Sequence, residues 1–332
     1  MNAPPADPAG RLTPVVRVAP AKLNLTLAVV GRGPDGYHAL HSVMVPLALS
    51  DRLSLAVAGG RGDTLHVDGI PTGAGKDDLV LRAFAEARLA VGAGWAGPGG
   101  PPPAIAARLE KRIPVAAGLA GGSSDAAAAL DGVLEAWGAE LSIEARSRVA
   151  ARLGSDVPFF LARGPALVEG RGETVSPLRG IVGTPPGVLL LTPSVAVPTP
   201  AVFAAYAAGA RSPGAAARTS SLHLAEELRA GLDSGAFVDR AGILAVANDL
   251  IAATAAVVPA LVGLRRALRR CLERPVGQSG SGPTLWVLYP SLADAESAAA
   301  TVRAAVADGS LQVPGDGEPF IAATTIQPRS ER

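Results

Sequence analysis

The chain has 332 residues, and its 30 basic and 29 acidic side chains leave a formal net charge of only +1. Without a basic stripe interleaved with aromatic residues, nucleic acid is an unexpected partner, and without an unbroken apolar stretch of ~18–20 residues so is a membrane. The single cysteine, Cys271, rules out an intrachain disulfide, which is typical of a reducing, cytoplasmic compartment.

The first elements expected along the chain are a tail and a strand. Residues 1–8 are rich in proline, lack the charged and apolar regions of a signal peptide, and are expected to be disordered. Residues 15–30 alternate as a β-strand, with leucines on one side and Lys22, Asn24 and Thr26 on the other. Such a polar face indicates a ligand or a partner, although a solvated sheet face explains the same pattern.

The remaining elements alternate between strands and helices. Strands are expected over 38–49, 53–57 and 65–67 as an antiparallel meander, and a helix follows the Asp77–Asp78 cap. Residues 92–103 form a Gly/Pro loop. Later elements are a strand at 105–109, helices ending at Gly138 and spanning 142–153, a strand at 188–192, helices between 200 and 272, a strand at 284–289, a helix at 291–307 and a strand at 320–326. This order predicts an α+β fold rather than a doubly wound sheet, with a domain boundary near residue 178.

The most informative segment is PVAAGLAGGSSD, residues 114–125. A strand leads into a glycine-rich loop and then into a helix with hydroxyls in its first turn. Free backbone N–H groups and the positive end of the helix dipole then point to one place, where a polyphosphate can bind. The common Gly-x4-Gly-Lys-Ser/Thr loop is absent from the sequence, and plain close packing is the alternative. Ala116, Ala117 and Ala120 are expected to keep φ below zero and stiffen the loop.

Asp156, in GSDVPFF at 154–160, is the best candidate for a general base, although capping of a short helix explains its position equally well. Only three lysines occur among the 30 basic residues, so Lys22 and Lys111 are candidates for sites that need a compact ammonium. The alternative for Lys111 is an ordinary charge on the protein surface. If Lys22 approaches Asp156, it keeps that carboxyl ionised and offsets charge on a transferring phosphoryl group. Phosphoryl transfer needs little more than such positioning and neutralisation.

Taken together, these segments resemble the small-molecule kinase superfamily of galactokinase, homoserine kinase, mevalonate kinase and phosphomevalonate kinase (GHMP). The loop follows its Pro-x-x-x-Gly-Leu-x-x-Gly-Ser-Ser pattern. The other matching segments are PAKLNL (20–25), DGYH (35–38), GSDVPFF (154–160), PTP (198–200) with Phe203, ND (248–249) and SGSG (279–282). Within the superfamily they are similar to the 4-diphosphocytidyl-2-C-methyl-D-erythritol kinase family, in order from about residue 16 to 326.

The resemblance implies a two-domain fold, with an ATP-binding and catalytic half at 11–178, a substrate-binding half at 179–328 and an active-site cleft between them. It implies ATP-dependent phosphorylation, with Mg²⁺, of the 2-hydroxyl of 4-diphosphocytidyl-2-C-methyl-D-erythritol in the non-mevalonate isoprenoid pathway. The cytidyl diphosphate substrate is then the small-molecule partner. A cytoplasmic monomer or weak homodimer is expected.

The resemblance also assigns residues. Asp156 takes the hydroxyl proton and Lys22 orients the hydroxyl. The nucleotide is held by Pro114, Gly118, Leu119, Ala120, Gly121, Gly122, Ser123, Ser124 and Lys111, with Ser123, or alternatively Ser124, near the metal. The substrate is bound by Asn24, Tyr37, His38, Thr199, Phe203, Gly280, Ser281 and Gly282. Tyr37, His38 and Phe203 are expected to grip the cytosine, because aromatic rings stack on a flat base. Asp125, where some relatives carry Asn, adds a negative charge at the helix start.

Several alternatives stay open at this point. Tyr37 and Phe203 could also belong to the hydrophobic core. His38 could be a turn residue, and Asn248-Asp249 could cap a helix. Another kinase of the superfamily, acting on homoserine, mevalonate or a sugar, is the second functional hypothesis. The third is a non-catalytic nucleotide-binding protein, although such a protein needs neither Lys22 nor Asp156.

Overall fold

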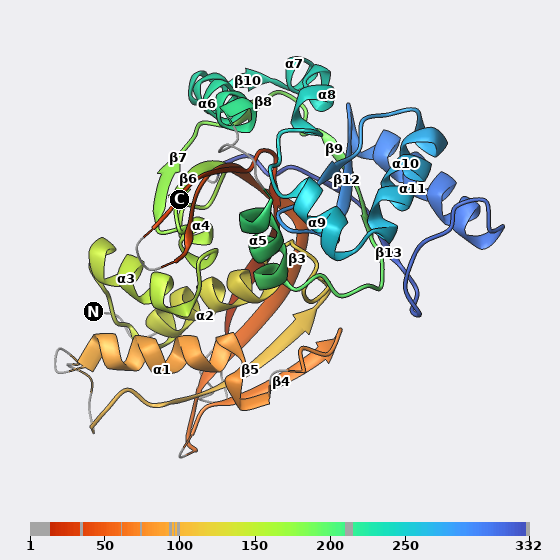
Figure 1. Ribbon diagram of the computed structural model, residues 1–332. Coiled ribbons are helices and arrows are strands. Elements are labelled where there is room, and N and C mark those ends of the chain that lie inside the picture. Colours follow the sequence, from red (N-terminus) through yellow and green to blue (C-terminus); the bar gives the residue numbers. More distant parts are fainter. Residues whose placement is uncertain are drawn as a thin grey trace. The chain divides into compact units, whose positions relative to one another are not determined.

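The protein is described by a computed structural model that covers residues 14–33, 36–60, 62–73, 75–92, 95, 97, 100–209 and 215–329. The tail at 1–8, Asp35 of the DGYH segment and part of the 92–103 loop therefore lie outside the described residues. The strands are β1 (Val15–Asn24), β2 (Ala28–Arg32), β3 (His38–Ala58), β4 (Thr64–Gly69), β5 (Ala104–Lys111), β6 (Ala166–Gly170), β7 (Thr174–Pro177), β8 (Ile181–Val182), β9 (Gly187–Thr192), β10 (Leu232–Asp233), β11 (Gly277–Gln278), β12 (Leu285–Tyr289) and β13 (Phe320–Thr325). The helices are the 3-10 turn η1 (Gly75–Asp77), α1 (Leu79–Val91), α2 (Gly121–Trp137), α3 (Ile143–Leu153), α4 (Val157–Leu161), α5 (Thr199–Ala208), α6 (Ala215–Ala230), α7 (Ser234–Asp239), α8 (Ala241–Leu244), α9 (Ile251–Val257), α10 (Ala260–Leu272) and α11 (Leu292–Ala307) (Figure 1).

Two compact units are built from interleaved parts of the chain. The first unit comprises Met1–Ala21, Leu49–Val115 and Ala120–Leu161, and the second comprises Lys22–Ala48, Ala116–Leu119 and Ala162–Arg332. The units therefore do not follow a single boundary near residue 178, because β1 and β3 each contribute residues to both. The assignment of ATP binding to 11–178 and of substrate binding to 179–328 stays a prediction.

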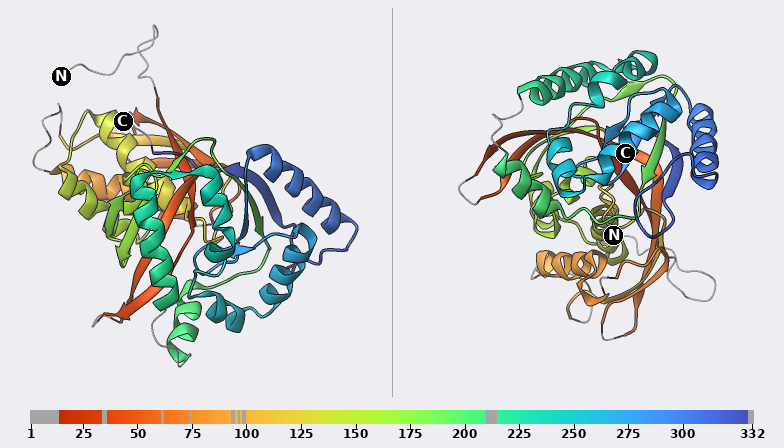
Figure 2. Two further views of the ribbon diagram at one scale, coloured as in Figure 1. Left: turned by 90° about the horizontal axis from the view of Figure 1, so that it is seen from above. Right: turned by 45° about the vertical axis from the view of Figure 1, so that its right-hand side comes forward.

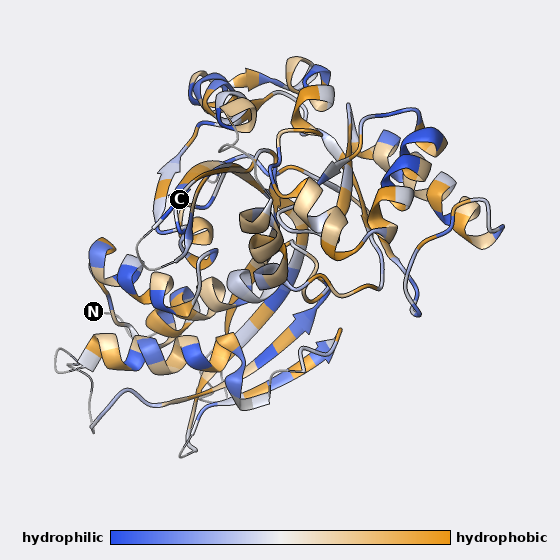
Figure 3. Cartoon of the chain, in the orientation of Figure 1, coloured by the Kyte–Doolittle hydropathy of each residue, from blue (hydrophilic) through white to orange (hydrophobic). Residues whose placement is uncertain are grey.

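The first unit packs α1, α2 and α3 into an apolar core with β5 and the second half of β3. Asp78 caps α1 by accepting a hydrogen bond from Val80 N at 2.9 Å, which confirms the predicted cap. Val80, Phe84 and Ala87 are buried at helical spacing, and hydrophobic and hydrophilic residues alternate along α1 (Figure 3). This spacing gives the helix one apolar face for the core.

The predicted meander of the first unit is wrong in two respects. β3 is one continuous strand over His38–Ala58, and β4 pairs with β5 in parallel. Residues 50–52 fall in the gap between the strands predicted at 38–49 and 53–57. Instead, the Asp51 carboxylate accepts hydrogen bonds from Arg112 N at 2.5 Å and Ile113 N at 2.9 Å. A tertiary partner thus satisfies this polar group, so the strand needs no turn there.

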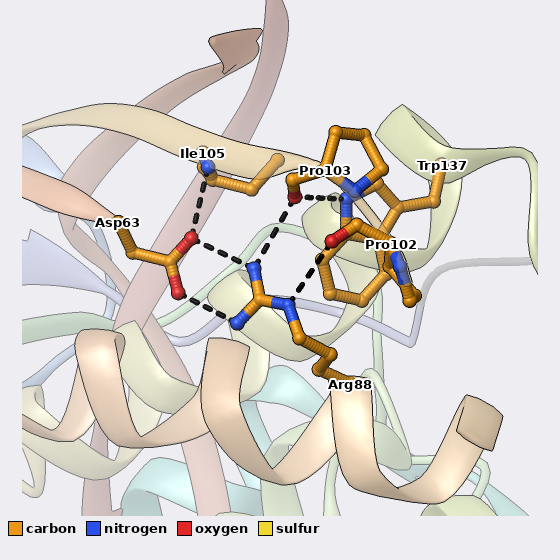
Figure 4. A network of polar contacts seen from close by, with 6 residues as sticks. All are labelled: Asp63, Arg88, Pro102, Pro103, Ile105 and Trp137. Carbon is orange, nitrogen blue, oxygen red and sulfur yellow. Dashed lines mark hydrogen bonds and ion pairs between the residues drawn. The ribbon is translucent and has the colours of Figure 1, made fainter. Parts of the chain in front are cut away.

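Arg88 ties the end of the 92–103 loop to the core of the first unit (Figure 4). Its guanidinium forms two hydrogen bonds with the Asp63 carboxylate, both at 2.8 Å. The same group donates to Pro102 O and Pro103 O at 3.2 Å, and Trp137 Nε1 donates to Pro103 O at 3.0 Å. The planar guanidinium of Arg88 thus donates to one carboxylate and to two carbonyls of the loop at the same time. These bonds anchor the loop at this end.

The second unit contains an antiparallel sheet in the order β11-β12-β9-β13. Helix α11 lies along β9 and β13 (Figure 2), and an apolar cluster from these elements and α10 forms the core. The predicted strands at 188–192, 284–289 and 320–326 and the helix at 291–307 are confirmed. In the same unit β2 and β6 pair with the first half of β3. Within the described residues, no helix is both long and apolar enough to cross a membrane.

The predicted strand at 15–30 is divided. β1 ends at Asn24 and β2 begins at Ala28, with Thr26 Oγ1 accepting from Val43 N at 3.0 Å in the interval. Lys22, Asn24 and Thr26 are only 4%, 2% and 0% exposed. The interpretation of their side as a solvated sheet face is therefore wrong, and the buried polar groups need partners inside the protein.

Candidate active site

Among the described residues, the N–H groups in the first turn of α2 have no backbone acceptor, as the loop sequence predicts. Its N-cap is Ala120, which has no polar side chain to cap with. The first hydrogen bond of the helix runs from Ser124 N to Ala120 O at 3.0 Å. The N–H groups of residues 121–123 precede this bond and so point beyond the helix, where the dipole favours an anion.

The loop backbone differs from the expectation for its alanines. Ala116 and Ala120 have φ of +55° and +54°, in the left-handed region, whereas Ala117 has no positive φ. The prediction that all three keep φ below zero is wrong for Ala116 and Ala120. The fold imposes the turn that glycine would adopt without strain, and each alanine pays about 1–2 kcal/mol for it.

Two hydroxyls occupy the start of α2. Ser123 is partly exposed, whereas Ser124 is 1% exposed, and within the described part of the chain the Ser124 hydroxyl has no hydrogen-bond partner. A buried hydroxyl without a partner costs about 1–3 kcal/mol. The uncapped helix start and these two hydroxyls fit a hydrated polyphosphate–metal group, with Ser123 as the accessible oxygen.

Lys111 lies beneath this helix start in a buried charge cluster of the first unit. Its ammonium donates to the Asp51 carboxylate and, at 2.7 Å, to Asp125 Oδ2; the three side chains are at most 3% exposed. A Cβ added at Gly121 would lie 2.8 Å from Lys111 Nζ. Lys111 is thus not a surface charge, because its ammonium is enclosed beneath the start of α2; its assignment to the nucleotide stays a prediction. Asp125 is likewise enclosed in this cluster, with its Oδ2 hydrogen-bonded to the Lys111 ammonium, and is not a free charge at the anion site.

Asp125 has an unusual acidity. Burial raises the pKa of its carboxyl to about 8, a rise that the Lys111 charge opposes and the nearby Asp51 carboxylate reinforces. Two carboxylates share one ammonium, so a buried net charge of −1 is avoided when one of them keeps a proton.

Lys22 is held by polar groups of the second unit. Its Nζ donates to Asn24 Oδ1 at 2.6 Å and to Gly118 O at 2.9 Å, and its backbone N donates to Leu119 O at 3.0 Å. An added Cβ at Gly280 would lie 3.2 Å from Asn24 Oδ1 and 3.7 Å from Lys22 Nζ. The structure therefore brings together Lys22, Asn24, Gly118 and Gly280, four predicted site residues from three separate segments.

Asp156 belongs to the first unit. It is partly exposed and directly precedes α4. A Cβ added at Gly154 would lie 3.9 Å from Ser123 Oγ, so the turn that carries Asp156 lies beside the first turn of α2. This places the candidate base near the predicted phosphate site; its pairing with Lys22 stays a prediction.

The predicted base-binding residues form an aromatic group in the second unit. The His38 ring stacks on Phe203 with centroids 5.2 Å apart and an interplanar angle of 24°. Burial, and secondarily the Arg32 charge, lowers the pKa of His38, which favours the neutral imidazole. Tyr37 is 57% exposed and so is not a core aromatic; the Arg171 guanidinium lies 3.7 Å from its ring centroid.

Sequence reasoning missed two members of this group. Tyr206 meets the His38 ring edge-on at 5.9 Å, and Arg171 covers one face of Tyr37. Tyr206 follows Phe203 by one helical turn of α5, a spacing that would have identified it. Arg171 sits in the β6–β7 turn and has no local signal.

The 198–203 and 279–282 segments also meet, because Thr199 Oγ1 and Ser281 Oγ are hydrogen-bonded at 2.9 Å. The Ser279 hydroxyl donates to Gly118 O at 2.9 Å. Gly118 has φ +78°, and an added Cβ would lie 2.6 Å from Ser279 O. Only glycine permits this close approach between the loop and the serine segment. The remaining predicted residues lie in the same segments: Pro114 and Leu119 in the loop before α2, Gly122 in the first turn of α2, and Gly282 at the end of 279–282.

Comparisons with known proteins identify the family of this chain. The family model described as "GHMP kinases N terminal domain" matches residues 78–164 of this chain. The 4-diphosphocytidyl-2-C-methyl-D-erythritol kinase of Pelotomaculum thermopropionicum is 37% identical over 290 residues, which cover 87% of this chain and 94% of that protein. The kinase of the same name from Salinispora arenicola is 38% identical over 301 residues, 90% of each chain.

Solved structures give the same family and fold. A crystal structure of a 4-(cytidine 5'-diphospho)-2C-methyl-D-erythritol kinase has a TM-score of 0.64 and 31% identity, covering 93% of this chain and 99% of that one. A homoserine kinase from Cytophaga hutchinsonii has a TM-score of 0.66 at 14% identity, covering 95% and 96%, and this likeness shows the fold alone. The predicted α+β GHMP fold is confirmed. By sequence over most of its length, this chain belongs to the 4-diphosphocytidyl-2-C-methyl-D-erythritol kinase family of the GHMP kinases.

Proposed function

We propose that the chain is an ATP-dependent kinase that phosphorylates the 2-hydroxyl of 4-diphosphocytidyl-2-C-methyl-D-erythritol in the non-mevalonate isoprenoid pathway. The observation that carries this proposal is the stacked His38–Phe203 pair in the unit that also holds Lys22 and Asn24. Aromatic rings suit a flat base. A small aliphatic alcohol such as homoserine or mevalonate has no use for them.

For the nucleotide, we assign the phosphates of ATP to the N–H groups of residues 121–123 and the adjoining loop. Ser123 is the proposed metal ligand, since its hydroxyl is the accessible one of the pair. Mg²⁺, when bound, neutralises charge on the phosphates. Ser124 is assigned to the same site because its buried hydroxyl needs a partner that the described residues do not supply.

For the transfer, Asp156 accepts the proton of the 2-hydroxyl while that oxygen bonds to the γ-phosphorus. The bond from the γ-phosphorus to the bridging oxygen breaks, and ADP leaves. Lys22 orients the hydroxyl and offsets the charge that develops, and Asn24 holds the methylerythritol. Its hydrogen bonds to Asn24 Oδ1 and Gly118 O keep the Lys22 ammonium in one position for this role.

A turnover assay with three acceptors tests the proposal. The purified chain should phosphorylate the cytidyl alcohol and leave homoserine and mevalonate untouched. Preference for either of the last two would support the second hypothesis, and no phosphorylation of any of them would support a non-catalytic binding protein.

Asp156→Asn should lower turnover by roughly 10²–10⁴ with ATP affinity nearly intact; near-normal turnover would identify Asp156 as a helix cap.

We also place the reaction in the cytoplasm, as the single cysteine suggests, and expect a monomer or weak homodimer. Sedimentation at several protein concentrations distinguishes the two.

A further inference from the structure

Asn248 does more than a helix cap requires. It is 6% exposed, and its Oδ1 accepts from the N of Leu250, the residue directly before α9, at 2.9 Å. Its Nδ2 also donates to Gln278 O at 3.1 Å and to Gly280 O at 2.9 Å. A cap uses only the oxygen, so the amide nitrogen serves another purpose: it holds the 278–282 segment.

The neighbours of Asn248 are attached to the chain that follows Lys22 and Asn24. Leu27 N donates to Ala247 O at 2.7 Å, and Asp249 N donates to Leu27 O at 2.9 Å. The Asp249 carboxylate accepts from Val29 N at 2.9 Å. Residues 247–249 are therefore fixed to the link between β1 and β2, only a few residues beyond the proposed catalytic lysine.

The 278–282 segment in turn contacts Lys22 and Asn24. Gly118 O accepts from both Ser279 Oγ and Lys22 Nζ, each at 2.9 Å, and Asn24 N donates to Ser279 Oγ at 3.3 Å. Gly280, with φ +57°, passes so close that a Cβ would lie 3.2 Å from Asn24 Oδ1. A shift of this segment would displace the hydrogen-bond partners of both residues.

Two further side chains add hydrogen bonds to the segment: Gln278, which belongs to it, and Thr254 of α9. Gln278 Nε2 donates to Thr254 Oγ1 at 3.0 Å and to Gly280 O at 3.1 Å. Thr254 Oγ1 donates to Ser281 O at 3.0 Å, and Thr254 is fully buried. Gly280 O thus accepts from two amides, and a buried network of this kind holds one geometry when all its members are satisfied.

We propose that Asn248 is a positioning residue for the acceptor: it fixes the 278–282 segment against Lys22 and Asn24 and so sets the orientation of the reacting hydroxyl. The proposal rests on the proposed function. Because Asn248 acts on the side of the acceptor and not on the α2 helix start, its loss should disturb the alcohol substrate and spare ATP. A residue that only stabilises the fold would show no such selectivity.

Asn248→Asp is the decisive variant, because it keeps the shape and the capping oxygen but turns two donated hydrogen bonds into contacts between a carboxylate and two carbonyl oxygens. We expect kcat/KM for the cytidyl alcohol to fall by about 10- to 100-fold, since misplacement near 1 Å costs on the order of 10²-fold. KM for ATP should stay within twofold. Asn248→Ala should give the same split. Unchanged acceptor kinetics in Asn248→Asp would overturn the proposal.

Leu250→Ala is the matched control. Leu250 is buried two residues away, and its truncation costs about 2–5 kcal/mol while every hydrogen bond to the 278–282 segment remains. If it lowers acceptor kcat/KM as much as Asn248→Asp does, general loosening explains the effect and the proposal fails.

Amide hydrogen exchange separates this inference from the proposed function. In Asn248→Asp, residues 279–282 should exchange faster than in the natural chain, whatever the acceptor proves to be. If the natural chain phosphorylates nothing, the proposed function fails, and the exchange still decides whether Asn248 holds the segment. Unchanged exchange would show that it does not.

Discussion

The Lys111 ammonium and the Asp125 carboxylate meet at 2.7 Å in a site where neither side chain is more than 3% exposed. Asp51 shares the same ammonium. This cluster lies directly beneath Gly121, the first residue of the helix whose N–H groups are proposed to bind phosphate. Its charge state therefore bears on stability and on the proposed nucleotide site.

Asp125→Asn should change the pH dependence of stability. The pKa of Asp125 rises from 3.8 to about 8 in the folded chain, chiefly through burial. Between these values the unfolded state binds fewer protons, so this group's contribution to the free energy of unfolding is present at low pH and is lost as pH rises towards 8. Asparagine mimics the protonated form at every pH.

The free energy of unfolding of the natural chain, minus that of Asp125→Asn, should therefore fall by up to about 1.4 kcal/mol per pH unit between pH 5 and 8 and level off above. Urea unfolding at pH 5, 6, 7, 8 and 9 measures this difference. A difference that stays constant over the range would show that Asp125 does not hold the proton.

The buried cluster shows what a sequence alone conceals. Asp125 is visible as an acidic residue near a helix start, and Lys111 as a rare lysine, but their partner Asp51 lies in a strand 60 residues before Lys111. Asp51 falls in the gap between the strands predicted at 38–49 and 53–57, where a buried partner had to be found before the strand could continue. A long-range ion pair supplies that partner, and only the folded chain reveals it.

Ala116→Gly and Ala120→Gly should each stabilise the protein. Both alanines occupy left-handed backbone, which costs an L-residue about 1–2 kcal/mol, whereas glycine loses about 0.4–1 kcal/mol through the greater freedom of its unfolded chain. The net expectation is a gain of about 0.5–1 kcal/mol in the free energy of unfolding at each site.

Ala117→Gly provides the contrast within the same loop. Ala117 has no positive φ and is 2% exposed, so glycine there relieves no strain and removes a packed methyl group. It should destabilise by about 1 kcal/mol. If all three substitutions destabilise equally, the left-handed alanines are not strained.

His38→Ala should raise KM for the cytidyl alcohol and leave KM for ATP unchanged, because it removes the ring that stacks on Phe203. Loss of one aromatic partner predicts a rise of about 3- to 10-fold.

The lowered pKa of His38 keeps the imidazole neutral above pH 6.5, so the KM of the natural chain for the cytidyl alcohol should not vary between pH 7 and 8. Steady-state kinetics with each substrate varied in turn measure both effects; an unchanged acceptor KM would remove His38 from the base site.

The motifs and their order along the sequence predicted much of the candidate site. Lys22, Asn24, Gly118 and Gly280 were all predicted, and the second unit gathers them. Arg171 was not, since it stands alone in a short turn and meets Tyr37 only through the pairing of β3 with β6. The double role of Asn248 was also hidden: an Asn before a helix suggests a cap, and nothing nearby indicates that its amide reaches a segment 30 residues away.

Arg88→Met should destabilise the first unit through the anchor of the 92–103 loop. The Asp63 carboxylate, 14% exposed, would lose both guanidinium hydrogen bonds, and two proline carbonyls would lose a donor. Asp63 would keep its hydrogen bond from Ile105 N, and Pro103 O would keep the one from Trp137 Nε1. Loss of the charge-assisted guanidinium bonds still predicts a loss of about 2–3 kcal/mol, and Arg88→Lys should recover only part of it, because an ammonium cannot form the planar fork. Arg112→Met is the control: its pair with Glu110 is 63% and 36% exposed, and exposed pairs contribute about 0–1 kcal/mol. Urea unfolding at one pH compares the three variants. Should Arg88→Met cost no more than Arg112→Met, the loop is held by its backbone and by Trp137 rather than by the arginine.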